Sequence, residues 1–142
     1  LTTGNTSVIA QYQSLIWVLQ NYRTGDLASA AKVFADARFD LIEDENIQAI
    51  VENVRQDMTA NVYQTLVDRG LEVWTVGNKT EAMEYFQASL TIRPDNPEAM
   101  FYVGRLYQDA GDTDNANTMF DKVVNEYADS EFAERARTAR GY

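Results

Sequence analysis

The sequence predicts an all-α protein built from three stacked helical hairpins and a C-terminal capping helix. Two observations carry this prediction. A glycine followed by Asp or Asn, with an alanine five and a phenylalanine nine residues after the glycine, recurs at Gly25, Gly77 and Gly111. The last two glycines are 34 residues apart, and a fixed period of this size is typical of a copied helix-turn-helix unit. The chain also has only two prolines and seven glycines, mostly at unit boundaries, so helices can run between the turns.

Each part of the repeated motif has a physical role. The glycine ends one helix, because a residue without a Cβ adopts the left-handed conformation most easily. The neighbouring Asp or Asn accepts a hydrogen bond from a free N–H group of the next helix. The alanine lets the two helices of a hairpin approach closely, and the phenylalanine fills the space between neighbouring hairpins. One unit cannot bury its apolar face alone, so we expect the copies to stack into a continuous core.

The first hairpin is predicted over about residues 8–39, after a disordered tail at 1–6. Thr6 or Ser7 caps the leading helix, in which apolar residues recur at helical spacing. The return helix follows the turn at Gly25.

The second hairpin, at about 46–92, is predicted to begin with one long helix at about 46–76. Between the first two turn glycines the chain has 18 residues more than one period, and this surplus lies in 40–61. Apolar residues keep a helical spacing there, and no Gly or Pro intervenes before Gly70. Fusing the surplus to the leading helix keeps the antiparallel alternation of helices, whereas a separate helix would reverse it. A break near 59–61 is the alternative.

The third hairpin is predicted at about 97–127 and the capping helix at 131–140. Asn96 is placed to cap the third hairpin, with Pro97 at the first helical position. The capping helix has acidic residues at its start and arginines towards its end, as the helix dipole favours. Residues 7–142 are therefore predicted to form a single domain.

These motifs resemble the tetratricopeptide repeat. The residues that carry the resemblance are Gly70, Ala82, Phe86 and Pro94 in one copy and Gly104, Tyr107, Gly111, Ala116 and Phe120 in the next. The resemblance is strong over 63–132, moderate over 11–39, and does not extend to 40–61. Three positions depart from the family pattern: Arg69, Val123 and Ala128. The resemblance implies a right-handed solenoid that binds other proteins without catalysis.

The closing segment 127–136 resembles the ends of bacterial envelope proteins of this family, in which the repeats follow a membrane anchor or a helical stalk. This resemblance implies an extracytoplasmic setting, membrane-anchored or secreted, with the cytoplasm as the alternative. Because the chain begins at Leu1 rather than Met, we expect a fragment or a processed form.

Composition argues against several classes of function. The net charge of −10, from 22 acidic and 12 basic residues, argues against nucleic acid and anionic membranes, which both need a basic footprint. Without Cys or His there is no thiolate, Cys/His zinc site or Ser-His pair, so no metal or cofactor is expected. The longest apolar run, Leu15–Leu19, is far too short to insert across a membrane.

Carboxylates are the remaining candidates for chemistry, and they cluster at 40–45 and 109–114. Neither cluster has the pattern of a calcium-binding loop. A carboxylate-based hydrolase is the alternative function, because paired carboxylates can hydrolyse glycosides. Both clusters, however, lie where turns and helix starts are expected, so we predict helix caps rather than an enzyme. Glycosylation sequons at Asn5 and Asn78 fit ordinary turn chemistry.

The resemblance implies that the leading helices line a concave groove, which would suit a peptide or helix of a partner protein with aromatic anchors. The predicted partner-binding residues are Tyr12, Leu15, Leu19, Tyr22, Gln64, Val67, Leu71, Trp74, Glu98, Phe101, Arg105, Gln108, Phe132 and Arg135. One alternative is that these residues form the core. Another is that the apolar face of the long helix pairs with a second copy as a homodimer. The groove lacks the lysines and asparagines of the family's clamp for terminal carboxylates, which argues against a receptor for chaperone tails.

Overall fold

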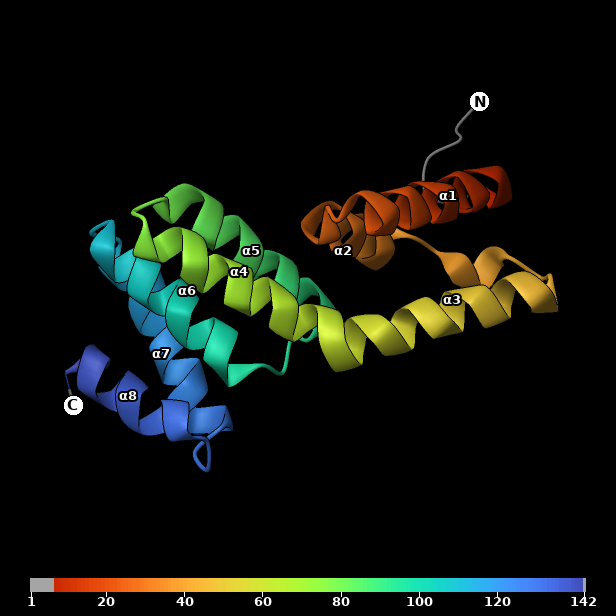
Figure 1. The fold of residues 1–142 in the computed structure, drawn as a ribbon. Helices are drawn as coiled ribbons and strands as arrows, with labels where there is room; N and C mark the ends of the chain where they lie inside the picture. Colours follow the sequence, from red (N-terminus) through yellow and green to blue (C-terminus); the bar gives the residue numbers. More distant parts are fainter. Residues whose placement is uncertain (1–6, 142) are drawn as a thin grey trace.

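The computed structural model describes residues 7–141, and every regular element in this part of the chain is a helix. The predicted tail at 1–6 lies outside the described residues. The elements in chain order are α1 (Val8–Thr24), α2 (Leu27–Asp36), η1 (Phe39–Leu41), α3 (Glu45–Asp57), η2 (Met58–Val62), α4 (Tyr63–Thr75), α5 (Lys79–Ile92), α6 (Pro97–Asp109), α7 (Thr113–Glu126) and α8 (Glu131–Arg140). Three hairpins, α1–α2, α4–α5 and α6–α7, are followed by the capping helix α8, so the predicted all-α solenoid is confirmed (Figure 1).

The repeated turn motif has the predicted local structure in all three copies. Its Asp or Asn accepts a hydrogen bond from the backbone N–H three residues later: Asp26 from Ser29, Asn78 from Glu81 and Asp112 from Asn115. The three turn glycines have φ values of 84°, 88° and 79°, in the left-handed region that costs other residues energy. Each turn therefore ends one helix and starts the next within a few residues.

The predicted long helix is also present, as α3, η2 and α4 in direct succession from Glu45 to Thr75. The segment in which a break was the alternative is a π-helical turn, Met58–Val62, rather than an interruption. Both end residues of this turn are buried. The wider turn therefore keeps the apolar residues on both sides of it in the core while the helix continues.

The buried side chains form two clusters. The N-terminal core lies mainly among α1, α2, η1, α3 and η2, and the C-terminal core lies among α4 to α8. The long helix contributes to both, because Leu66 belongs to the N-terminal core and the next residue, Val67, to the C-terminal core. Figure 1 shows α1 to α3 at one end, α6 to α8 at the other, and the long helix running between them.

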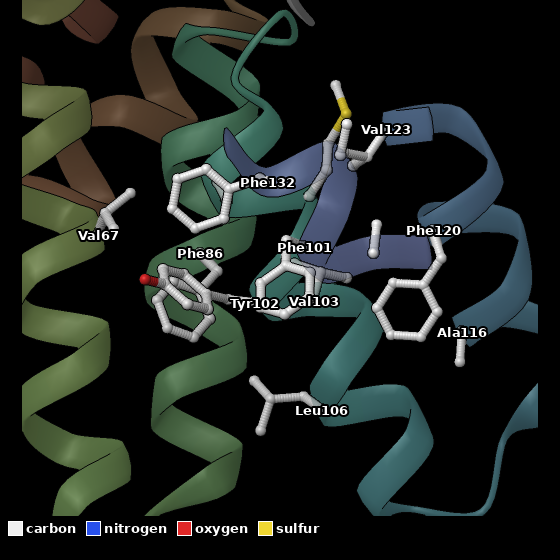
Figure 2. Packing of buried hydrophobic residues seen from close by; sticks show 14 of the residues in the cluster. Val67, Phe86, Phe101, Tyr102, Val103, Leu106, Ala116, Phe120, Val123 and Phe132 are labelled. Atoms are coloured by element: carbon white, nitrogen blue, oxygen red, sulfur yellow. The ribbon is translucent and has the colours of Figure 1, made fainter. Parts of the chain in front are cut away.

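In the second and third hairpins, the motif phenylalanine packs directly on a glycine of the leading helix. A Cβ on Gly70 would lie 2.5 Å from Cε1 of Phe86, and a Cβ on Gly104 would lie 2.6 Å from Cε1 of Phe120. Both rings are fully buried, and Figure 2 shows Phe120 standing beside Phe101 of α6. The ring therefore occupies the space that a side chain at Gly70 or Gly104 would fill; we call this space the glycine seat.

Candidate functional site

Aromatic side chains connect α4 and α6, the leading helices of the second and third hairpins, with the capping helix α8. Trp74 of α4 lies edge-on to Tyr102 of α6, with ring centroids 6.2 Å apart. Tyr102 in turn lies edge-on to Phe132 of α8 at 5.9 Å, and the ring of Phe86 packs 5.2 Å from it (Figure 2). Such aromatic pairs stabilise a fold by more than the burial of their apolar area alone accounts for. The leading helices are therefore fixed side by side as one surface.

Polar contacts join α4 and α6 at the start of the two repeats. The Gln64 side-chain amide donates to Oε1 of Glu98 at 3.3 Å, and these two residues, 34 apart, occupy equivalent positions in successive repeats. The Tyr102 hydroxyl donates to Oε2 of Glu98, also at 3.3 Å. Burial and the nearby Glu98 carboxylate raise the pKa of Tyr102, so its hydroxyl remains a donor at neutral pH.

A cavity of about 460 Å³ lies between α6 and α8. Phe101, only 2% exposed, forms part of its wall, and the guanidinium of Arg135 lies 4.8 Å from the centroid of that ring. Arg105 also lines the cavity and makes no ion pair within residues 7–141. Glu134 is the acidic residue of the lining, and it pairs with Arg137 at 3.4 Å. Two guanidinium groups therefore border this cavity in a chain whose net charge is −10.

The predicted partner-binding residues fall into three groups. Four are buried in the core: Leu15, Val67, Phe101 and Phe132. Five are half-buried: Tyr22, Gln64, Leu71, Trp74 and Glu98. Five are exposed: Tyr12, Leu19, Arg105, Gln108 and Arg135. The core interpretation therefore describes the first group, whereas the second and third groups present polar and aromatic atoms on the leading helices.

The structure also brings together residues that the sequence reasoning missed. Tyr102 links α4, α6 and α8, and its place four residues after Glu98 could have indicated that both lie on one face of α6. A second cavity, of about 420 Å³, lies among α2, η1, α3, η2 and α5. Phe34 lines this cavity, with the guanidinium of Arg55 5.2 Å from its ring centroid.

Most of the apolar face of the long helix is buried within its own chain. Six of its side chains lie in the two cores: Val51, Val54, Met58, Val62, Leu66 and Val67. Near the start of the helix, Ile47 is half-buried and Ile50 is 40% exposed. The long helix therefore offers little exposed apolar surface for pairing with a second copy.

The acidic clusters have structural contacts. Asp44 caps α3 and Asp112 caps α7, while Asp109 pairs with Lys79 at 3.6 Å. A hydrogen bond from Arg38 lowers the pKa of Asp40, opposite to the raised pKa that a general acid needs. No group of three or more acidic side chains within residues 7–141 is arranged to hold a metal ion. Over the same residues, no helix is long and apolar enough to cross a membrane.

These features define a class of protein: an all-helical repeat protein whose leading helices share one surface. Models of the tetratricopeptide repeat match this chain at residues 63–96 and 98–130. These two segments are therefore tetratricopeptide repeats. Repeats of this family mediate protein–protein interactions and typically are non-catalytic scaffolds. No curated protein matches the chain.

Proposed function

We propose that the chain is a scaffold that binds a peptide or helix of a partner protein across the leading helices α4 and α6 and the capping helix α8. In this proposal an acidic side chain of the partner occupies the cavity between α6 and α8. The observation that carries the proposal is the pair of guanidinium groups, Arg105 and Arg135, at the edge of that cavity. A guanidinium forms strong, directional hydrogen bonds to a carboxylate.

The remainder of the surface supports an extended or helical ligand rather than a small molecule. Half-buried Leu71 and Trp74 of α4 provide apolar contact area next to the cavity-bearing helix α6. Gln64 and Glu98 provide hydrogen-bonding groups nearer the start of these helices. Partly exposed aromatic side chains flanked by polar groups are typical of the residues that dominate protein interfaces.

The test uses peptides selected from a random library on the wild-type domain. Trp74 reports binding by its fluorescence in a Trp17→Phe background, because the chain has only two tryptophans. We expect the selected peptides to be enriched in acidic residues. Reversing one charge with Arg105→Glu should weaken binding at least about tenfold, or about 1.4 kcal/mol, and salt should weaken wild-type binding.

Lys122→Glu is the matched control, because it reverses an exposed cation on α7 outside the cavity. It changes the net charge by the same amount and should leave the affinity nearly unchanged. If both variants weaken binding equally, the effect comes from net charge and not from the cavity. If the wild type, Arg105→Glu and Lys122→Glu bind with equal affinity, the proposed site is contradicted. The extracytoplasmic bacterial setting stays a prediction, which fractionation of source cells with an antibody to the domain would test.

A further inference from the structure

The outer face of α1 carries a row of large apolar side chains that are exposed. Ile9, Tyr12, Ile16 and Leu19 are 70%, 37%, 56% and 41% exposed. Their spacing of three, four and three residues is that of the a and d positions through which helices pair in coiled coils. We call these four residues the outer seam.

The same helix has another row of side chains that the hairpin already buries. Gln11, Leu15 and Val18 of α1 face the interior, and the Gln11 side-chain oxygen accepts a hydrogen bond from the backbone N–H of Arg38 at 2.6 Å. These buried residues hold the hairpin together, which explains why two are apolar and Gln11 is hydrogen-bonded. The hairpin contact does not explain why the residues of the outer seam are apolar.

Charge identifies the kind of surface that can cover the outer seam. Helix α1 contains no acidic residue, and Arg23 is its one cation, whereas the chain has 22 acidic residues and a net charge of −10. Two copies that approach through their acidic surfaces repel each other. Two copies that approach through the outer seam bring no carboxylate of α1 into the contact.

Within residues 7–141, no other exposed apolar row is present to pair with this one. Outside α1, the exposed large apolar side chains of this part of the chain are Ile50 in α3 and Val76 directly after α4. A contact between copies through exposed apolar side chains therefore joins the outer seam to itself, which is the arrangement that a twofold axis produces.

We propose that the outer seam binds the outer seam of a second copy of this chain, with the two α1 helices antiparallel. The midpoint of the seam lies between Tyr12 and Ile16, so Ile9 of one copy lies opposite Leu19 of the other, and Tyr12 lies opposite Ile16. The antiparallel arrangement opposes the two helix dipoles and separates the two Arg23 side chains. The seam and the adjacent Val8 expose on the order of 500 Å², within the size at which an apolar patch on a monomer is often functional. Two such surfaces bury about 1,000 Å², the lower bound for a specific interface.

The first test measures mass in solution by light scattering and sedimentation over a range of concentrations. The wild-type chain should be a dimer, and Ile9→Glu/Ile16→Glu should be a monomer with unchanged helicity, because both side chains are already exposed. Val76→Glu is the matched control, since Val76 is 82% exposed outside α1, and it should stay dimeric. A monomeric wild-type chain, or a dimer that survives the double substitution, would overturn the proposal.

The second test locates the axis, using a chain that has no native cysteine. An equimolar mixture of Tyr12→Cys and Ile16→Cys chains should form disulfide-linked heterodimers on mild oxidation, because the two positions lie opposite each other across the seam. Val76→Cys should not form a disulfide with either chain. Efficient cross-linking of Ile16→Cys chains with one another instead would overturn the antiparallel arrangement, because only parallel helices bring residue 16 next to its own counterpart.

Discussion

The first hairpin and the two that follow it share one turn motif but use its phenylalanine differently. Seven residues before the turn glycine, the second and third hairpins have Gly70 and Gly104, whereas the first has Val18. Val18 is fully buried, and the first hairpin's phenylalanine, Phe34, is only half-buried. Its ring packs against Phe39 at 5.2 Å and lines the cavity among α2, η1, α3, η2 and α5.

This difference shows that the phenylalanine depends on its opposite residue for its role. Where a glycine stands opposite, the ring is buried between helices and the hairpins stack regularly. Where Val18 occupies the seat, the ring turns towards the extension formed by η1 and α3, and Arg55 covers it. Valine in place of glycine at this position therefore accompanies the difference between the regular second and third hairpins and the first hairpin, which has a cavity beside it.

The largest expected effect that separates the two environments is the loss of the ring itself. Phe86→Ala removes a fully buried ring that contacts Trp74 and Tyr102, and it should lower the free energy of unfolding by about 3–5 kcal/mol. Phe34→Ala removes a half-buried ring at a cavity and should cost less than half as much. Urea unfolding followed by circular dichroism measures both, and equal losses would contradict the comparison.

A smaller effect is expected when the glycine seat is filled. Gly104→Ala would normally stabilise a helix by about 1 kcal/mol through propensity. Here the new Cβ would lie 2.6 Å from Cε1 of Phe120, whose ring is fully buried, so we expect a net loss of about 1–3 kcal/mol. The sign of the stability change therefore shows whether the contact with Phe120 or the helix propensity dominates.

The control combines Gly104→Ala with Phe120→Leu. If the clash is the cause, the double variant should be more stable than the sum of the two single changes predicts, because the two residues are in contact. Stabilisation by Gly104→Ala alone would show that the ring does not need the seat.

Much of this fold could be predicted because its signals are local. Turn glycines, their Asp or Asn caps and the spacing of apolar residues each act within a few residues, and the structure confirms them. The π-helical turn at Met58–Val62 had no such signal. The turn lets the long helix bury side chains in both cores. This need arises from contacts between segments that are distant in the sequence, so no local pattern indicates it.

The candidate site was harder to predict for a related reason. Repeat position places a side chain on a leading helix, but α6 is enclosed by neighbours on several sides, and seven of its residues are buried. Phe101 therefore lies in the core, while Arg105, four residues later, lines the cavity. On α1, exposed Tyr12 and Leu19 likewise flank buried Leu15, because two rows interleave on one helix.

The smallest expected effect compares two Arg–Asp pairs in the connections that follow the first and second hairpins. A hydrogen bond from Arg38 lowers the pKa of Asp40, and one from Arg93 lowers the pKa of Asp95. Arg93 also donates to the backbone oxygen of Thr59 at 2.9 Å and lies 4.6 Å from the centroid of the Tyr63 ring, whereas the Arg38–Asp40 pair is exposed. The second pair therefore anchors a connection to the long helix, and the first pair does not.

Because each folded-state pKa lies below the ordinary value, each pair stabilises the fold above that value and ceases to do so as pH falls through the folded pKa. We expect Asp95→Asn to reduce the loss of stability between about pH 7 and pH 3 by less than about 1 kcal/mol. Asp40→Asn should reduce this loss less, because the exposed Arg38 side chain does not bond to the long helix. Urea midpoints of the three proteins at both pH values measure this, and a larger effect of Asp40→Asn would contradict the anchoring role of Arg93.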